Sequence, residues 1–403
     1  MSSQQARGMP PPPPPDWNPD SQYTPRRKPS RRGTAAKFLA VAIVLILLLY
    51  ILLYTPLAGL FLAGLTGRTY AESASFTLER EITIDIQSGT ITWICDIPLP
   101  ETIPGSSGSV QSVDRADPVP YVPGTEKYGG DWAVWTGSDS SAVTLRMTYR
   151  ATVRTVIWDI GAEDSGTAAD IPEWVLLQQG GDEWQLEENP GDPSEEYKIW
   201  PSHPTIKELS ADLTSGSLTV YENTKNVYSY VHENIAYQTV SGSEPKSCLR
   251  TLSDRAGDCD DQSILLISLL RAAGIPAWLA FGMMYDSGTG SWGAHAWAEI
   301  YIPLREGAGG SVAIDVVNGE FLVRNCNRLE EWKSDGDGSH LSDYYHMLSY
   351  NYSAVNPHQS APVIVLSDDY SGEYEASSGR VYGIASHLEN DFLAEVSFPR
   401  KVF

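Results

Sequence analysis

Apolar and polar residues alternate along several runs between residues 76 and 158. The clearest are residues 82–86, Ile-Thr-Ile-Asp-Ile, and residues 143–149, Val-Thr-Leu-Arg-Met-Thr-Tyr. A period of two places the apolar side chains on one face of a strand, and the Gly, Pro and Ser residues between the runs mark turns. Residues 68–160 are therefore predicted to form an antiparallel β-sandwich domain.

A helical pattern replaces this alternation after Ile206. Residues 217–234 repeat apolar side chains at helical spacing, and Ser217 is a possible start cap. Residues 259–273 are apolar on nearly every face, and a Gly and a Pro follow them, as is usual where a helix ends. A helix that is apolar all round is buried, so this one predicts the centre of a second core.

Three runs after that helix have strand character and are joined by Gly-rich turns: 277–284, 295–303 and 311–317. The prediction for residues 206–330 is a buried helix packed on an antiparallel sheet, and the fold class is α+β. Residues 161–205 lack sustained periodicity and are predicted to be a linker or an irregular excursion. Residues 331–403 form a C-terminal extension to which no role is assigned.

Residues 38–65 contain no charged side chain over 28 positions. At about 1.5 Å per residue a helix of this length exceeds the roughly 30 Å hydrocarbon core of a bilayer, which predicts a transmembrane helix. A cleaved signal peptide is the alternative, although the run is about twice the usual length of its apolar region. Basic residues precede the span and only Arg68 follows closely, so we expect a cytoplasmic N-terminus and a single-pass protein of the cell membrane, with its C-terminal domains outside.

Residues 1–37 are proline-rich and basic, and we expect a disordered cytoplasmic tail. Seven basic and two acidic side chains give this tail a charge of +5, so the net charge of −23 leaves −28 for the rest of the chain. Such an acidic exterior repels phosphates and argues against nucleic acid as a partner.

Cys259 stands between two aspartates at the start of the predicted buried helix, and His295 and Asp315 follow it along the chain. A thiol requires a base to become a thiolate, and an imidazole requires an anion that holds its tautomer and stabilises its charged form. The positive end of the helix favours a thiolate, and Asp258 is placed to cap the helix. The acidic neighbours oppose the ionisation of the thiol, because negative charge raises its pKa.

Each of these residues also has a simpler explanation. A cysteine before a buried helix is most often a small hydrophobic residue, and an aspartate such as Asp315 can end a strand by bonding its own backbone. Asp258, Asp260 and Asp261 could bind calcium, but the run lacks the glycine and the distal glutamate of a calcium loop, so no metal and no cofactor is expected. The other cysteines, Cys95, Cys248 and Cys326, allow at most one disulfide, and the sequence does not choose the pair.

Four sequence blocks in order resemble the transglutaminase-like superfamily. They are the segment 221–237, the run Gly-Asp-Cys-Asp-Asp at 257–261 with Leu-Leu-Arg-Ala-Ala-Gly-Ile-Pro-Ala at 269–277, the run His-Ala-Trp-Ala-Glu at 295–299, and Asp315. The resemblance covers roughly residues 206–317. It implies a papain-like fold and a catalytic triad of Cys259, His295 and Asp315. It also suggests Tyr237 as a second donor to an oxyanion, beside the backbone N–H of Cys259.

This family resemblance implies a cysteine enzyme that acts on amide bonds of peptides or proteins through a thioester, and the predicted span at 38–65 would anchor it to the membrane. We expect hydrolysis, as in a cysteine protease, rather than transfer of the acyl group to an amine. The alternative is a catalytically inactive transglutaminase-like fold that serves as an extracytoplasmic binding or scaffold module. The acidic flank of Cys259 favours this alternative.

Overall fold

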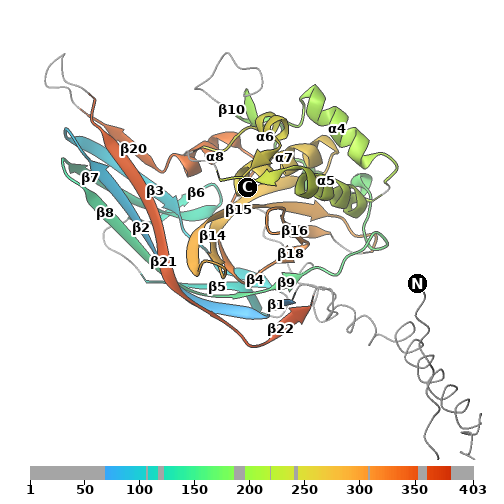
Figure 1. The fold of residues 1–403 in the computed structure, drawn as a ribbon, viewed down its shortest axis with the longest axis horizontal. Coiled ribbons are helices and arrows are strands. Elements are labelled where there is room, and N and C mark those ends of the chain that lie inside the picture. The colour runs from blue at the N-terminus through green and yellow to red at the C-terminus, as the bar shows by residue number, and fades with distance from the viewer. Residues whose placement is uncertain are drawn as a thin grey trace, which may run out of the picture. The chain divides into compact units, whose positions relative to one another are not determined.

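The computed structural model of the chain describes residues 69–105, 108–116, 122–185, 196–217, 219–239, 244–306, 309–352 and 361–382. All of them belong to one compact unit, Ala63–Phe403 (Figure 1). The predicted tail at 1–37 and the predicted membrane span at 38–65 lie outside the described residues. Within the described ranges, no helix combines the length and the apolar character needed to cross a bilayer.

Two antiparallel sheets, built mostly from the first half of the chain, enclose one hydrophobic core. The first sheet has the order β21-β2-β8-β5-β4 and consists of β2 (Ser73–Ile86), β4 (Ile103–Gly105), β5 (Gly108–Ala116), β8 (Val143–Arg154) and β21 (Ile364–Ala376). The second has the order β20-β3-β7-β6 and consists of β3 (Ile91–Pro98), β6 (Val122–Lys127), β7 (Gly130–Asp139) and β20 (Leu348–Asn351). The two alternating runs of the sequence lie in β2 and β8, which pair from Ser73 to Ile84 of β2, and every second residue of β2 is buried.

A five-stranded antiparallel sheet and a set of helices form the second core. The strand order is β17-β16-β15-β14-β19, with β14 (Ala277–Asp286), β15 (Ser291–Ile302), β16 (Gly310–Asp315), β17 (Glu320–Phe321) and β19 (Arg328–Lys333). The helices are α4 (Pro204–Thr214), α5 (Val220–Asn234), α6 (Cys248–Asp254) and α7 (Cys259–Ala272). In Figure 1 they are gathered on one side of this sheet.

The predicted buried helix is confirmed as α7. Each residue from Asp261 to Arg271 is buried, because α7 packs against β14 and β15 on one side and against α4, α5 and α6 on the others. Helix α5, by contrast, begins at Val220, and its cap is Thr219 rather than Ser217. The reason is a capping box: the Thr219 side chain accepts from the Glu222 N–H, and the Glu222 side chain bonds back to Thr219.

The segment 161–205 contributes Ile171, Val175, Trp184 and Ile199 to the same core as α7. It contains a 3₁₀ turn (Ala168–Asp170), α3 (Glu173–Leu176), and the paired strands β10 (Glu183–Gln185) and β11 (Tyr197–Ile199). Smaller pairs are β1 (Thr69–Ala71) with β22 (Arg380–Tyr382), β9 (Val156–Ile157) with β18 (Val323–Arg324), and the parallel pair β12 (Ala236–Tyr237) with β13 (Ala256–Gly257).

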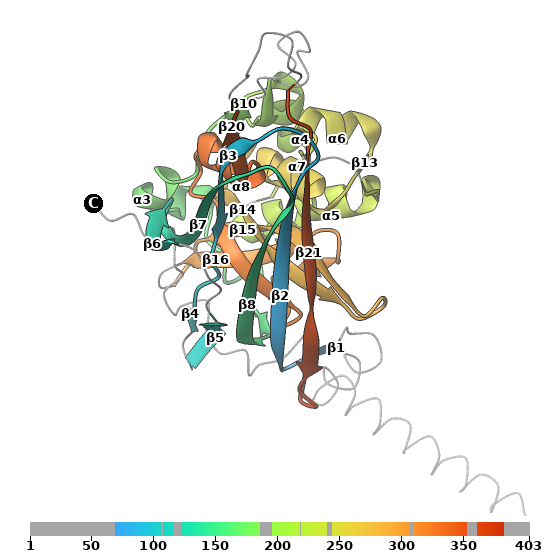
Figure 2. The same ribbon diagram turned by 90° about the vertical axis from the view of Figure 1, so that its left-hand side faces the viewer.

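Residues after 330 add one helix and three strands to the described part of the chain. Helix α8 (Gly338–Tyr345) contacts β10, β20 pairs with β3, and β21 pairs with β2 along thirteen residues. Figure 2 shows β21, β2 and β8 running side by side. Strands β21 and β20 thus lie at the outer positions of the two sheets that enclose the first core.

Buried charges join these late strands to β2. The Arg80 guanidinium on β2 binds Glu331 of β19 at 2.5 Å, and it binds both carboxylate oxygens of Asp368 on β21, at 2.9 and 2.7 Å. Arg80 is 3% exposed. A buried ion is costly unless it is paired, so this arginine requires both acids to be in place.

Replacing Arg80 with alanine is expected to lower the free energy of unfolding by about 3 to 5 kcal/mol, because Glu331 would remain buried without its cation. The matched control is Arg146→Ala on the adjacent strand β8, where an exposed guanidinium pairs with Glu81 at 2.7 Å. That loss should stay below about 1 kcal/mol. Urea unfolding of the three proteins measures both values, and equal losses would contradict a special role for the buried pair.

Candidate active site

Cys259 is the first residue of α7 and is half-buried. Asp258 caps the helix as predicted: its side chain accepts from the Asp261 N–H, and the Asp261 carboxylate accepts in return from the Asp258 N–H at 3.3 Å. The preceding Gly257 lies so close to the Asp261 side chain that an added Cβ would come within 2.5 Å of it. The cysteine therefore sits at the positive end of a capped and buried helix.

His295 and Asp315 lie on the neighbouring strands β15 and β16. The register pairs Ala298 with Ile314, which puts the two side chains at diagonal positions on one face of the sheet. The ring Nε2 of His295 is 2.7 Å from Oδ2 of Asp315. His295 is 6% exposed and Asp315 1% exposed, so the pair is shielded from water.

Two residues that the sequence analysis did not identify complete the surroundings of Asp315. The Arg328 guanidinium of β19 is fully buried and lies 3.0 Å from Oδ2 of Asp315. Asn318 donates its backbone N–H to Oδ1 at 3.0 Å and its side-chain amide to Oδ2 at 2.8 Å. Burial by itself raises the pKa of Asp315, but the charges of His295 and Arg328 and these hydrogen bonds outweigh it and hold the pKa well below its usual value.

A sequence signal existed for Asn318 but not for Arg328. Asn318 follows Asp315 by three residues in an Asn-Gly turn, a spacing at which an aspartate commonly accepts the backbone N–H of the turn. Arg328 opens the run Arg-Leu-Glu-Glu-Trp-Lys, which resembles an exposed charged strand. It is buried because β19 pairs with β14 at the edge of the sheet and its guanidinium also binds Glu320.

Cys259 contacts β15 through the residue next to His295. The backbone N–H of Ala296 faces the Cys259 sulfur and lowers the pKa of the thiol. Burial is the larger effect and raises the pKa, and Asp260 and Asp258 add to it, so the pKa of Cys259 lies well above that of a free thiol. Among the described residues, no hydrogen bond joins the sulfur to the imidazole. Because Nε2 of His295 is bonded to Asp315, Nδ1 is the ring nitrogen available to the thiol.

The acid next to the cysteine has a partner from the C-terminal part of the chain. The hydroxyl of Tyr345, at the end of α8, donates to Oδ2 of Asp260 at 2.5 Å. Burial and the neighbouring Asp258 raise the pKa of Asp260 well above its usual value. This favours the neutral carboxyl and so reduces the negative charge beside the sulfur.

The carboxylates of Asp258, Asp260 and Asp261 have oxygens within 4.8 Å of one another. The structure gives each of them a protein partner. Asp258 and Asp261 cap the helix, Asp261 also accepts from the Lys246 N–H at 2.6 Å, and Asp260 accepts from Tyr345. Helix capping therefore accounts for the cluster, and we derive no metal chemistry from it.

Tyr237 lies on β12, opposite Gly257 in the parallel pair with β13. Its side chain is 57% exposed. Partial burial raises the pKa of the Tyr237 hydroxyl, and the neighbouring Cys259 raises it further. This short strand pair therefore places Tyr237 beside Gly257, which precedes Cys259 by two residues.

Changing Asp315 to asparagine removes the charge that faces His295 and Arg328, and we expect the free energy of unfolding at pH 7 to fall by about 3 kcal/mol or more. The folded pKa lies below the unfolded value of about 3.9, so this stabilisation is complete above that value and is lost as the pH falls through the folded pKa. The difference in the free energy of unfolding between wild type and variant should therefore decrease from pH 4 towards pH 2. Urea unfolding across this range tests it, with the exposed Asp369→Asn as control, and a difference independent of pH would contradict the assignment.

Comparisons with known proteins agree with this geometry. The family model described as the transglutaminase-like superfamily matches residues 207–311, a segment that contains Cys259 and His295 and ends four residues before Asp315. The chain is also similar to a candidate cysteine protease from Cytophaga hutchinsonii, with a TM-score of 0.51 and 16% identity. That match covers 80% of this chain and 97% of the other, and at this identity it shows a shared fold alone.

Two further solved structures give weaker matches. A candidate protease from Parabacteroides distasonis has a TM-score of 0.26 and 14% identity over 63% of this chain and 47% of its own. The periplasmic domain of TgpA from Pseudomonas aeruginosa has a TM-score of 0.29 and 15% identity over 63% of this chain and 90% of its own. Scores this low carry no argument about the fold. No curated protein matches the chain. The family match and the position of Cys259 at the start of a buried helix beside β15 together lead to one conclusion: the chain contains a transglutaminase-like superfamily domain.

Proposed function

We propose that this protein is a cysteine hydrolase that cleaves amide bonds of peptides or proteins, with Cys259 as nucleophile, His295 as base and Asp315 as the group that orients His295. The observation that supports it most is the 2.7 Å contact between His295 Nε2 and Asp315 Oδ2. The residue after His295, Ala296, has its backbone N–H facing the Cys259 sulfur. A buried carboxylate that holds one imidazole nitrogen leaves the other directed to a nucleophile.

The reaction begins when Nδ1 of His295 takes the thiol proton as the sulfur attacks the carbonyl carbon. The carbonyl π-electrons move to the oxygen, and the C–S bond forms. The backbone N–H of Cys259, at the helix start, is placed to donate to this oxyanion, and Tyr237 is our candidate for the second donor. The tetrahedral intermediate then collapses to a thioester as the C–N bond breaks, and the leaving amine takes the proton from the imidazolium.

Water completes the cycle. His295 removes a proton from the attacking water, the C–S bond breaks, and the imidazolium returns its proton to the departing sulfur. The ionised Asp315 stabilises the imidazolium in both halves of the reaction, which is why its low pKa matters.

The description of the Cytophaga protein as a candidate cysteine protease supports hydrolysis over transfer to an amine. The basic and apolar pattern of residues 1–65 supports a single membrane anchor, with the catalytic part outside.

A second candidate function is a binding module without catalysis, and one observation favours it. The pKa of Cys259 is raised by burial and by its acidic neighbours, so the resting sulfur retains its proton. Proton transfer to His295 during attack overcomes this in an enzyme, whereas a binding module has no need of it. The pH dependence of thiol alkylation separates the two, because only an active pair gives an alkylation rate near neutral pH that falls when His295 is replaced by alanine.

Cys259→Ala is expected to abolish amidase activity on a peptide substrate, and also the labelling by iodoacetamide that occurs in the wild type when His295 accepts the thiol proton. The label should fall on one residue, because Cys95, Cys248 and Cys326 are fully buried free thiols. Mass spectrometry of the labelled protein locates the site. The matched control is Cys248→Ala, which should keep both properties, and amidase activity that persists in Cys259→Ala would overturn the proposal.

Tyr237→Phe tests the second oxyanion donor. The ring stays in place and only the hydroxyl is lost, so we expect kcat to fall by roughly 10²-fold while KM changes little, as for other removed donors. Steady-state kinetics measure the two constants. Tyr230→Phe on α5 is a control of the same chemistry, and an unchanged kcat in Tyr237→Phe would assign the donor elsewhere.

A further inference from the structure

An acidic groove of about 840 Å³ lies between the end of α3 and α8. Five of its lining side chains are carboxylates: Asp182, Glu183, Asp335, Asp337 and Asp343. His340 is the basic side chain among the lining residues, and it pairs with Asp335 at 3.0 Å. The groove therefore presents a strongly negative surface to any ligand.

Glu183 gives this groove a feature that an ordinary acidic surface lacks. It is 6% exposed, and its Oε1 accepts from the Arg271 guanidinium at 2.5 Å. Its other oxygen, Oε2, is buried and has no hydrogen-bond partner among the described residues. Buried carboxylate oxygens are almost always hydrogen-bonded, so this one is suited to receive a donor from a bound molecule.

The spread of the acids indicates which kind of cation fits. Among the described residues, the group whose oxygens converge as metal ligands would is Asp258, Asp260 and Asp261, outside this groove. Calcium requires six to eight oxygens around one point, whereas the groove acids are distributed along a volume that holds several residues. Separate acids match a chain of separate positive charges, such as successive lysine or arginine side chains.

Aromatic side chains connect the groove with the start of α7. Trp184 forms part of its wall, and its ring lies 4.7 Å from the ring of Tyr345. The hydroxyl of Tyr345 binds Asp260, which is next to Cys259. The side chains of Trp184 and Tyr345 therefore lie between a segment in the groove and the start of α7.

We propose that this groove binds a basic peptide segment and places a lysine or arginine side chain against Glu183. The inference rests on the proposed function for its catalytic meaning, since the bound segment would be the part of the substrate that flanks the cleaved amide bond. Its binding is a separate property that does not require a reactive thiol.

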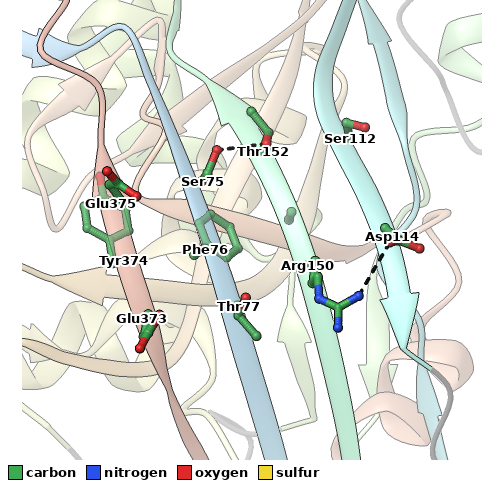
Figure 3. A pocket seen from close by; sticks show the side chains of 11 residues that line it. Ser75, Phe76, Thr77, Ser112, Asp114, Arg150, Thr152, Glu373, Tyr374 and Glu375 are labelled. Atoms are coloured by element: carbon green, nitrogen blue, oxygen red, sulfur yellow. Dashed lines mark hydrogen bonds and ion pairs between the residues drawn. The ribbon is translucent and has the colours of Figure 1, made fainter.

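Binding of a fluorescent tetralysine peptide to the full chain tests the proposal by anisotropy. The double variant Asp337→Asn with Asp343→Asn removes two exposed charges of the groove and should weaken binding about fivefold. The matched control removes two exposed charges elsewhere, through Glu373→Gln with Glu375→Gln. Glu373 and Glu375 line a second cavity of about 510 Å³ on β21, β2, β8 and β5. Figure 3 shows this cavity, with Arg150 paired with Asp114. The control should change the affinity less than about twofold.

Glu183→Gln keeps the size of the side chain and should weaken tetralysine binding about tenfold, because the charge-assisted bond to the ligand is lost. Equal losses in the groove pair and the control pair, or no loss in either, would overturn the proposal. The proposal would also be overturned if calcium alone displaced tetralysine and if the same groove variants lost the binding of calcium. Cys259→Ala should bind tetralysine normally, so a failure of the proposed catalysis and a failure of the groove give different results.

Discussion

The burial of α7 is the constraint on which the rest of the structure depends. A helix whose apolar residues cover every side must be enclosed on every side, and here β14 and β15 cover one face while α4, α5 and α6 cover the others. Protein cores are packed like crystals, so a helix held this way cannot slide without opening cavities. The position of its first residue, Cys259, follows from that packing and not from contacts of the cysteine itself.

The second constraint is the neutralisation of the buried charge around Asp315. Asp315 is buried among His295, Arg328 and Asn318, and Arg328 in turn binds Glu320. Removing one member of such a group leaves another ion buried without a partner, so the group forms together or not at all. The contact between His295 and Asp315 is thus part of the stability of the sheet as well as of the proposed chemistry.

Helix α8 contacts both the buried ion pair of Arg80 with Glu331 and the acid beside Cys259. Its adjacent residues Tyr344 and Tyr345 reach in different directions, the first to Glu331 at 3.5 Å and the second to Asp260. Glu331 binds Arg80 of β2, and Asp260 stands beside Cys259. Two adjacent residues of α8 therefore contact the Arg80 group on one side and the start of α7 on the other. The state of the acid beside the thiol depends on the packing of residues far along the chain.

The sequence by itself determined the elements whose signal is local. Alternation located β2 and β8, an unbroken apolar pattern located α7, and Asp258 located its start, because strand faces, helix faces and caps depend on neighbours a few residues away. The motif around Cys259, His295 and Asp315 identified the superfamily for the same reason. Even so, Thr219 rather than Ser217 caps α5, since a reciprocal bond from Glu222 decides between two possible starts.

Only the tertiary structure decided which distant charges meet. The members of these pairs are separated by 13 to 288 residues in the sequence. The pairs are Arg328 with Asp315, Tyr345 with Asp260, Arg80 with Glu331 and Asp368, and Arg271 with Glu183. A charged residue in a sequence reads as exposed, because burial of an ion is favourable only once its partner is in place. That condition depends on how strands and helices come together, and no local pattern records it.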